Sequence, residues 1–259
     1  MEYLNALTTG PGYVLDTLSA SELHHVRNLI TEQYLLRIAE FQPDIVDRAR
    51  EAGLPQYHFL PIQFDHAGKW TKELRLLNAQ HISTFESMGF FQRIRRHLGP
   101  SAIISHDELN WRLVRPNRPE DVGPVHADKW FWDAGYGVGL MPEGFDRFKI
   151  WMAIHVEPGA NGLCIKPGSH LINTWKHHFE VRGGIRKPVL DEDERDLMME
   201  LLPLHPGQMV MFHDELLHGG VVNRGKTCRV SLELTVLYDK AEAEARSSCS
   251  AEFSLNQAS

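Results

Sequence analysis

The chain has few cysteines, no long apolar run and no recognisable leader segment. Its three cysteines, Cys164, Cys228 and Cys249, are odd in number and lack CxxC spacing, which argues against a disulfide framework and a thiolate zinc site. We therefore expect a reducing, cytoplasmic environment. No apolar stretch approaches the roughly 20 residues that span a bilayer, and no basic region followed by an apolar run opens the sequence. The sequence thus predicts neither a membrane protein nor a signal peptide.

An excess of basic residues is also missing. The 259 residues include 27 Lys and Arg against 34 Asp and Glu, which gives a formal net charge of -7. This acidic balance argues against a nucleic-acid partner, because such partners favour clustered Lys and Arg. The sequence shows no internal repeat and no low-complexity segment. With 42% hydrophobic residues, the chain is long enough for one globular domain with a sizeable core.

The first hundred residues predict a mostly helical half. Ser19 and Glu22 have capping-box spacing. Apolar residues follow at helical spacing, namely Leu23, Val26, Ile30 and Tyr34. A second helix is expected over residues 83–98, because a Ser and a Glu three residues apart open it and a Gly-Pro pair ends it.

From about residue 103, short apolar runs alternate with turn signals. The runs include RFKIWMAIHVEP, GLCIKPGSHL, GQMVMFHD and RVSLELTVLY, and separators such as PGANG, HPGQ and NRGK supply the residues that tight turns need. Many short strands with this spacing predict a sandwich or barrel, interrupted by one helix over residues 191–202. We expect a single domain over residues 1–259, with a helical support at 1–100, a β core at 101–240 and a tail at 241–259.

One stretch of the β half, VHADKWFWD, combines a His-x-Asp pair with three aromatic rings. His126 and Asp128 lie at i and i+2, so on a strand both side chains would point to the same face. With 15 histidines in the chain, such a pair alone has little weight. Two histidines and one carboxylate, however, form the facial triad that leaves open positions on Fe(II). The pair therefore predicts a metal site only if a second histidine joins it.

The stretch HPGQMVMFHDELLHGGVVNRGKTCRVSLELTVLY offers that histidine. We prefer His218, which precedes a glycine pair, to His213, which would share a strand face with two methionines. Arg229 and Ser231 share a strand face further on, and a guanidinium fork beside a hydroxyl is a good receptor for a carboxylate. The other interpretation of Arg229 is an interior ion pair with Glu233, which shares its face.

These motifs together resemble a known family. The order His-x-Asp, NGLCIKPGSH, PGQMVMFHDELLHGG and NRGKTCR resembles the phytanoyl-CoA dioxygenase-like branch of Fe(II)/2-oxoglutarate oxygenases, over the segment from Arg112 to Tyr238. The resemblance implies a mainly β (α+β) fold with a double-stranded β-helix (jelly-roll) core, and Fe(II), 2-oxoglutarate and O2 as cofactors. It implies that the metal ligands are His126, Asp128 and His218, and that 2-oxoglutarate contacts Arg229, Ser231, Trp151 and Arg115.

The reaction implied by the resemblance is hydroxylation of an unactivated C–H bond of a small molecule, with release of succinate and CO2. In relatives that halogenate, a small residue replaces the carboxylate ligand, so Asp128 favours hydroxylation. Two alternatives remain. One is a cupin-like metalloenzyme that does not use 2-oxoglutarate, against which Arg229 and Ser231 argue. The other is a metal-free jelly-roll protein that presents its aromatic side chains to a ligand.

The aromatic residues after His126 are the candidate substrate wall. On a strand, Trp130 and Trp132 would share the face of His126 and Asp128, while Phe131 would pack outward. If the strand ends after Asp128, this alternation fails and the stretch becomes a loop over the metal. In either case we expect at least one tryptophan close to the iron. We expect the substrate to meet Trp130, Trp132 and Tyr136. The alternative is that these rings belong to the hydrophobic core alone.

Overall fold

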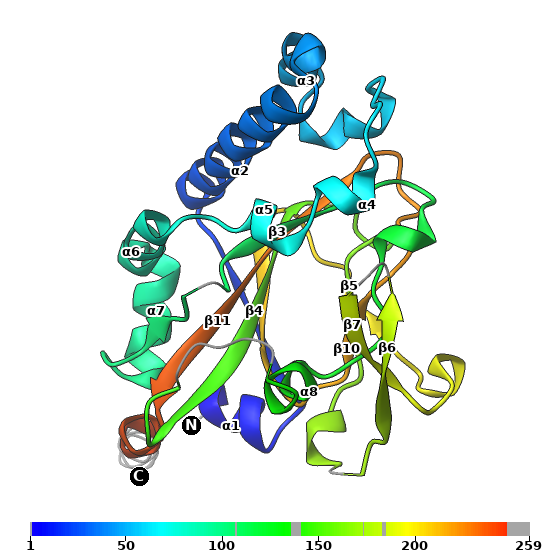
Figure 1. Ribbon diagram of the computed structural model, residues 1–259. Helices are drawn as coiled ribbons and strands as arrows, with labels where there is room; N and C mark the ends of the chain where they lie inside the picture. Colours follow the sequence, from blue (N-terminus) through cyan, green and yellow to red (C-terminus); the bar gives the residue numbers. More distant parts are fainter. Residues whose placement is uncertain (1, 107, 136–140, 173, 183–184, 248–259) are drawn as a thin grey trace.

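The computed structural model describes residues 2–106, 108–135, 141–172, 174–182 and 185–247 (Figure 1). The helices are α1 (Glu2–Thr8), α2 (Ala20–Phe41), α3 (Val46–Ala52), α4 (His66–Lys69), α5 (Lys72–Arg75), α6 (Ala79–Ser87), α7 (Gly89–Leu98) and α8 (Asp128–Asp133). The strands are β1 (Tyr13–Thr17), β2 (Ile103–Ile104), β3 (Asn110–Val114), β4 (Phe145–His155), β5 (Leu163–Ile165), β6 (His177–Arg182), β7 (Ile185–Leu190), β8 (Glu200–Leu201), β9 (Gln208–His213), β10 (His218–Gly220) and β11 (Arg229–Asp239).

The strands build a larger and a smaller antiparallel sheet. The larger has the order β1-β9-β4-β11-β2, with β3 also paired to β11, and the smaller has the order β10-β5-β8. Strands β6 and β7 form a separate hairpin. The two sheets are the halves of the predicted double-stranded β-helix, and most of the helices lie in the first hundred residues (Figure 1). The predicted α+β fold is confirmed.

Strand β11 shows how the larger sheet separates the core from the site. Its side chains Val230 and Leu232 are fully buried in the cluster that joins this sheet to the N-terminal helices. The alternate side chains Arg229, Ser231 and Glu233 point to the opposite face, because successive residues of a strand alternate. The helices therefore cover one face of the larger sheet, and the other face carries polar residues.

Helix α2 begins as the sequence predicts. The Ser19 hydroxyl accepts a hydrogen bond from the backbone N–H of Glu22 (3.2 Å), and the Glu22 carboxylate accepts one from the backbone N–H of Ser19 (2.7 Å). This capping box satisfies backbone donors that a helix start leaves free. The buried face of the helix carries Val26, Ile30, Tyr34 and Ile38.

We expect Ser19→Ala to lower the free energy of unfolding by about 1 kcal/mol, because the N-cap acceptor is lost. The matched control is Ser83→Ala, since Ser83 is exposed inside α6 and alanine there favours the helix. Urea denaturation of both variants measures the difference. Equal losses in the two variants would contradict the cap's contribution.

The second predicted helix is in fact two helices. Helix α6 starts before residue 83, where the Asn78 side chain accepts a hydrogen bond from the backbone of His81, and the backbone turns extended at Met88 (φ −66°, ψ 152°) before α7 begins. Glu86 does not cap a helix, because its carboxylate accepts a hydrogen bond from the backbone N–H of Ile104 (2.8 Å). The predicted start and continuity were wrong because Glu86 bonds to a distant strand instead.

The helix predicted over residues 191–202 was also wrong. The segment holds a short 3-10 turn, Glu194–Asp196, followed by strand β8. The Asp193 side chain accepts a hydrogen bond from the backbone N–H of Arg195, and Met198 has a φ of 50°. A right-handed helix cannot pass through a residue with positive φ, so the acidic run ends after one turn.

The remaining expectations concern the ends and the membrane. Residues 241–247 of the predicted tail are helical, and Ala243 is fully buried in the core. Residues 248–259 lie outside the described part of the chain. Across the described residues, no helix has both the length and the apolar character that a membrane span requires.

Candidate metal centre

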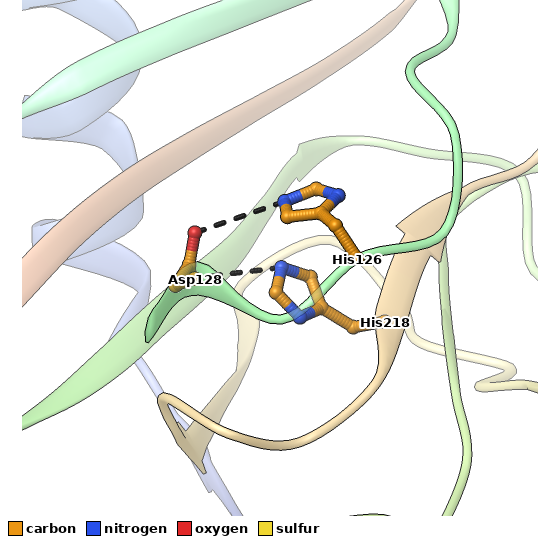
Figure 2. A group of neighbouring side chains, drawn as sticks. All are labelled: His126, Asp128 and His218. Atoms are coloured by element: carbon orange, nitrogen blue, oxygen red, sulfur yellow. Dashed lines mark ion pairs between the residues drawn. The ribbon is translucent and has the colours of Figure 1, made fainter. Parts of the chain in front are cut away.

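Two segments from distant parts of the chain meet at His126 and His218. The backbone N–H of His126 donates to the carbonyl oxygen of His218 (3.0 Å), and that of His218 donates to the carbonyl oxygen of His126 (2.9 Å). This antiparallel bridge puts the two imidazole centroids 4.5 Å apart. Helix α8 begins two residues after His126, and Figure 2 shows its first residue, Asp128, facing both rings.

Each imidazole is held with one nitrogen free for a metal. Nδ1 of His126 lies 2.9 Å from the carbonyl oxygen of Pro124, and Nδ1 of His218 lies 2.9 Å from that of Leu216. A carbonyl oxygen only accepts hydrogen bonds, so each Nδ1 carries the proton. The lone pair is therefore on Nε2 of both rings. Such bonds to the far nitrogen orient histidine ligands in metal sites.

The free nitrogens converge on one carboxylate. Nε2 of His126 lies 3.7 Å from Oδ1 of Asp128, and Nε2 of His218 lies 3.6 Å from Oδ2 (Figure 2). The three ligand atoms lie within 4.8 Å of one another. Oδ2 is buried and has no hydrogen-bond partner, which is costly for a carboxylate unless a cation binds it. Two imidazoles and one carboxylate are a donor set that suits Fe(II).

The charges around the site favour the ligand forms of these side chains. Burial alone would raise the pKa of Asp128, but Lys149 and the two histidines lower it, and the net pKa lies below its usual range. Burial lowers the pKa of His218 to about 4. At neutral pH Asp128 is therefore anionic and His218 is neutral, as metal binding requires.

A cavity of about 40 Å³ leads from these three residues to Arg229 and Trp151. Arg229 is 3% exposed, and its Nη1 donates to the carbonyl oxygen of Gly162 (2.7 Å). Its Nε has no partner, and the same holds for the fully buried hydroxyl of Ser231. The Arg229 guanidinium lies over the Trp151 ring, 5.8 Å from its centroid. Arg229 thus lies on the cavity wall with Nε unpaired, whereas Ser231, whose hydroxyl also lacks a partner, does not line the cavity.

Arg229 does not form the interior ion pair with Glu233 that the sequence left open. Glu233 pairs instead with Arg112, with an Oε1–Nε distance of 2.7 Å. Within the described residues, no carboxylate lies within 4.0 Å of the Arg229 guanidinium. Burial lowers the pKa of Arg229 to about 10, and the positive charge of Arg112 adds to this shift. A buried guanidinium without an anion fits a site whose anion is a ligand.

The sequence model of one family, described as phytanoyl-CoA dioxygenase (PhyH), matches residues 24–231. The chain belongs to the phytanoyl-CoA dioxygenase family. Its cofactors are accordingly Fe(II), 2-oxoglutarate and O2, and the protein is an oxygenase. The two alternative interpretations, a metalloenzyme that does not use 2-oxoglutarate and a metal-free binding protein, do not agree with this cofactor set. A search of curated protein sequences found no match.

Solved structures of similar shape agree with the fold of this phytanoyl-CoA dioxygenase family member. EvdO2 from Micromonospora carbonacea var. aurantiaca, complexed with 2-oxoglutarate, superposes with a TM-score of 0.55 at 16% identity, over 88% of this chain and 86% of that chain. The non-heme monooxygenase ThoJ in its apo form superposes with a TM-score of 0.55 at 16% identity, over 92% of this chain and 77% of that chain. At these identities the similarity shows the fold alone.

The aromatic residues of this family member lie differently from the strand prediction, which was wrong because α8 starts at Asp128. Trp130 stacks on His177 (centroids 4.2 Å apart) and is 8% exposed, away from both cavities beside the metal centre. Phe131 does not pack outward: its ring contacts His126 edge-on, with centroids 5.2 Å apart. Trp132 lines the outer cavity described below. Tyr136 lies outside the described residues.

Two other residues weighed in the sequence lie off the cavity walls. The guanidinium of Arg115 is bound by Asp121, with an Nη2–Oδ1 distance of 2.8 Å, and it lines neither cavity. His213 is outside the metal group and packs on His170, with centroids 5.1 Å apart. His218, not His213, is the histidine that the fold brings to His126.

Three charged residues line the cavity walls, and sequence reasoning did not place them beside the candidate metal site. Arg112, Lys149 and Glu233 line the inner cavity and also the outer one next to it. They lie on strands β3, β4 and β11. A charge at an inward position of a largely apolar strand was the available signal, because an inward charge needs a partner or a ligand.

Proposed function

We propose that this protein hydroxylates an unactivated C–H bond of a small molecule at an iron held by His126, Asp128 and His218. The observation that carries the proposal is the set of buried groups without partners: Oδ2 of Asp128, Nε of Arg229 and the hydroxyl of Ser231. A cation would be the partner of Asp128, and a carboxylate would be the partner of Arg229 and Ser231. EvdO2, one of the solved structures of similar shape, is complexed with 2-oxoglutarate.

Different residues of the inner cavity would bind the metal and the cosubstrate. His126, Asp128 and His218 would hold the Fe(II), and a set of three protein ligands would leave positions for 2-oxoglutarate and O2. Arg229 receives the distal carboxylate of 2-oxoglutarate in a charge-assisted bond, with Ser231 beside it. Trp151 is 2% exposed and forms part of the wall, which keeps water out.

Bound Fe(II) supplies the oxidative chemistry, in which O2 and 2-oxoglutarate yield succinate, CO2 and one oxygen atom for the substrate. The protein supplies geometry and a dry site for this chemistry. Asp128 fills the coordination position that a halide would need, so hydroxylation is the expected outcome. Gly219 and Gly220 lie on the cavity wall. A Cβ on Gly220 would lie 3.2 Å from Cγ1 of Val122, a tight contact, and 3.5 Å from Nη1 of Arg229, an ordinary one.

The proposal predicts a visible charge-transfer band when Fe(II) and 2-oxoglutarate are added together to the protein without oxygen. In air, the same mixture should release succinate, and a chelator should stop the release. The absorbance spectrum and a succinate assay measure the two effects. A band-free mixture that forms no succinate would reject the oxygenase, and iron binding without a 2-oxoglutarate effect would favour a different metalloenzyme.

A further inference from the structure

An outer cavity of about 360 Å³ adjoins the metal centre and fits a small-molecule ligand. It shares His126 and Asp128 with the inner cavity, and residues of helix α5 and of strand β7 in the β6–β7 hairpin also line it. Its charged lining residues are six basic and four acidic: Lys72, Arg75, Arg112, Lys149, Arg186 and Lys187, with Glu73, Glu108, Asp128 and Glu233.

The buried acidic residues of this wall are already bound by basic ones. Glu108 accepts hydrogen bonds from Nζ of Lys72 (2.6 Å) and from Nζ of Lys149 (2.9 Å), so two ammonium groups share one carboxylate. Glu233 pairs with Arg112. Asp128 belongs to the proposed iron. The excess charge of the cavity wall is therefore positive.

Arg75 is a basic residue of the wall that main-chain carbonyls hold, with Glu73 and Glu233 near enough to act on its charge but not bound to it. Its Nε donates to the carbonyl oxygen of Trp70 (2.8 Å), and its Nη1 donates to that of Trp111. No carboxylate of the described chain lies within 4.0 Å of it, and its Nη2 donates to no described residue. Burial lowers the pKa of Arg75 to about 9, and Arg112 adds to the shift. Two main-chain carbonyls thus hold a charged guanidinium at the cavity.

The opposite side of the outer cavity is less polar. Phe131 and Trp132 from α8 line it, together with Pro124 and Pro188. The Arg147 guanidinium lies over one face of Trp132, 4.5 Å from the ring centroid, and Phe131 contacts His126. An apolar part of a ligand that packs on these side chains would lie next to the metal centre.

We propose that Arg75 is the receptor for an oxyanion of the substrate, a carboxylate or a phosphate, whose apolar body packs on Phe131 and Trp132. The inference rests on the proposed function, because it places the oxidised carbon beside the iron of that site. The guanidinium is fixed in advance by Trp70 and Trp111, so little conformational entropy is lost when the anion binds. A cationic substrate is disfavoured, because the buried acidic residues of the wall already have partners.

The test measures binding rather than turnover. Protein loaded with Ni(II) and 2-oxoglutarate is titrated calorimetrically with phenylacetate, phenyl phosphate, benzyl alcohol and benzylamine, which share a ring and differ in charge. We expect at least one of the two oxyanions to bind at least 10-fold more tightly than benzyl alcohol. The oxyanion that binds more tightly, phenylacetate or phenyl phosphate, indicates whether the substrate carries a carboxylate or a phosphate.

Variants then locate the receptor. Arg75→Met should remove the preference for the oxyanion, and Arg75→Lys should retain part of it, while the affinity for 2-oxoglutarate stays within about 2-fold. Arg48→Met is the matched control, because Arg48 is exposed on α3 and lines neither cavity. If Arg75→Met does not fold, Arg186→Ala at the exposed rim replaces it. We expect this variant to bind the oxyanion about 3-fold more weakly than the wild-type protein.

The outcomes separate the two proposals. Benzyl alcohol or benzylamine binding as tightly as the oxyanions, no binding of either oxyanion, or an unchanged preference in Arg75→Met would overturn the receptor. In each of these cases, intact 2-oxoglutarate binding would leave the proposed function standing. Failure of the wild-type protein to bind 2-oxoglutarate would instead overturn the proposed function.

Discussion

Replacing His218 by alanine is expected to abolish the charge-transfer band and to reduce succinate release by more than about 100-fold. Loss of a group that only orients a metal ligand already lowers metal affinity or activity by about 10- to 100-fold. His218 is proposed as a ligand itself. Its Nε2 faces Asp128, and its ring is 6% exposed, so no water can readily take its place. Calorimetric titration with Fe(II) under nitrogen measures the metal affinity directly, apart from turnover.

The matched control is His213→Ala, which removes a histidine five positions earlier in the same stretch. His213 packs on His170 and lies outside the group that could hold a metal. We expect this variant to bind iron and to show the band, with a loss of stability of about 1 kcal/mol for the ring contacts. Equal loss of iron in both variants would mean that neither histidine is specifically a ligand.

The sequence allowed the convergence of His126, Asp128 and His218 to be predicted because their positions depend on backbone features that a sequence displays. His218 precedes a Gly pair, and a Cβ on Gly219 would lie 3.4 Å from Val125. This close approach allows the segment before α8 to pair with β10, which brings His126 to His218. The motif of glycines and histidines therefore specifies a contact between strands, not only a local turn.

The position of the aromatic residues could not be predicted in the same way. The pattern of VHADKWFWD fits a strand as well as a helix, because large apolar residues occupy successive positions. Its helical state depends on tertiary contacts: the backbone N–H of Lys129 donates to the carbonyl oxygen of Asp214 (3.0 Å), and Trp130 stacks on His177. The partners lie on distant segments, so no local rule reveals them.

The arrangement of the charged wall could not be predicted for a related reason. Lys72 and Lys149 come from a helix of the N-terminal half and from a core strand, and both bind Glu108. Each residue taken singly has the ordinary interpretation of a solvated charge. Only their convergence on one carboxylate beside the metal centre makes them part of a site, and that convergence follows from the packing of the helical half on the larger sheet.

Arg229→Met is expected to raise the 2-oxoglutarate concentration for half-maximal band intensity by about 100-fold, because a charge-assisted bond to the distal carboxylate is worth about 1.5–3 kcal/mol. The iron affinity should stay near the wild-type value, since the guanidinium is no metal ligand. Methionine fills similar volume without a charge. Removal of a buried, uncompensated charge offsets the lost bond to the Gly162 carbonyl oxygen. The unfolding free energy without 2-oxoglutarate should therefore not fall.

Two measurements distinguish this role from a structural one. Thermal unfolding of the wild-type protein with Fe(II) should shift upward when 2-oxoglutarate is added, and the shift should vanish in Arg229→Met at the same ligand concentration. Arg118→Ala serves as the control, because Arg118 is exposed, pairs with Glu120 and lines neither cavity. A variant that unfolds early yet keeps its 2-oxoglutarate affinity would assign Arg229 to the stability of the sheet. A stable variant that no longer responds to 2-oxoglutarate would assign it to the cosubstrate, because no carboxylate among the described residues forms an ion pair with this buried cation.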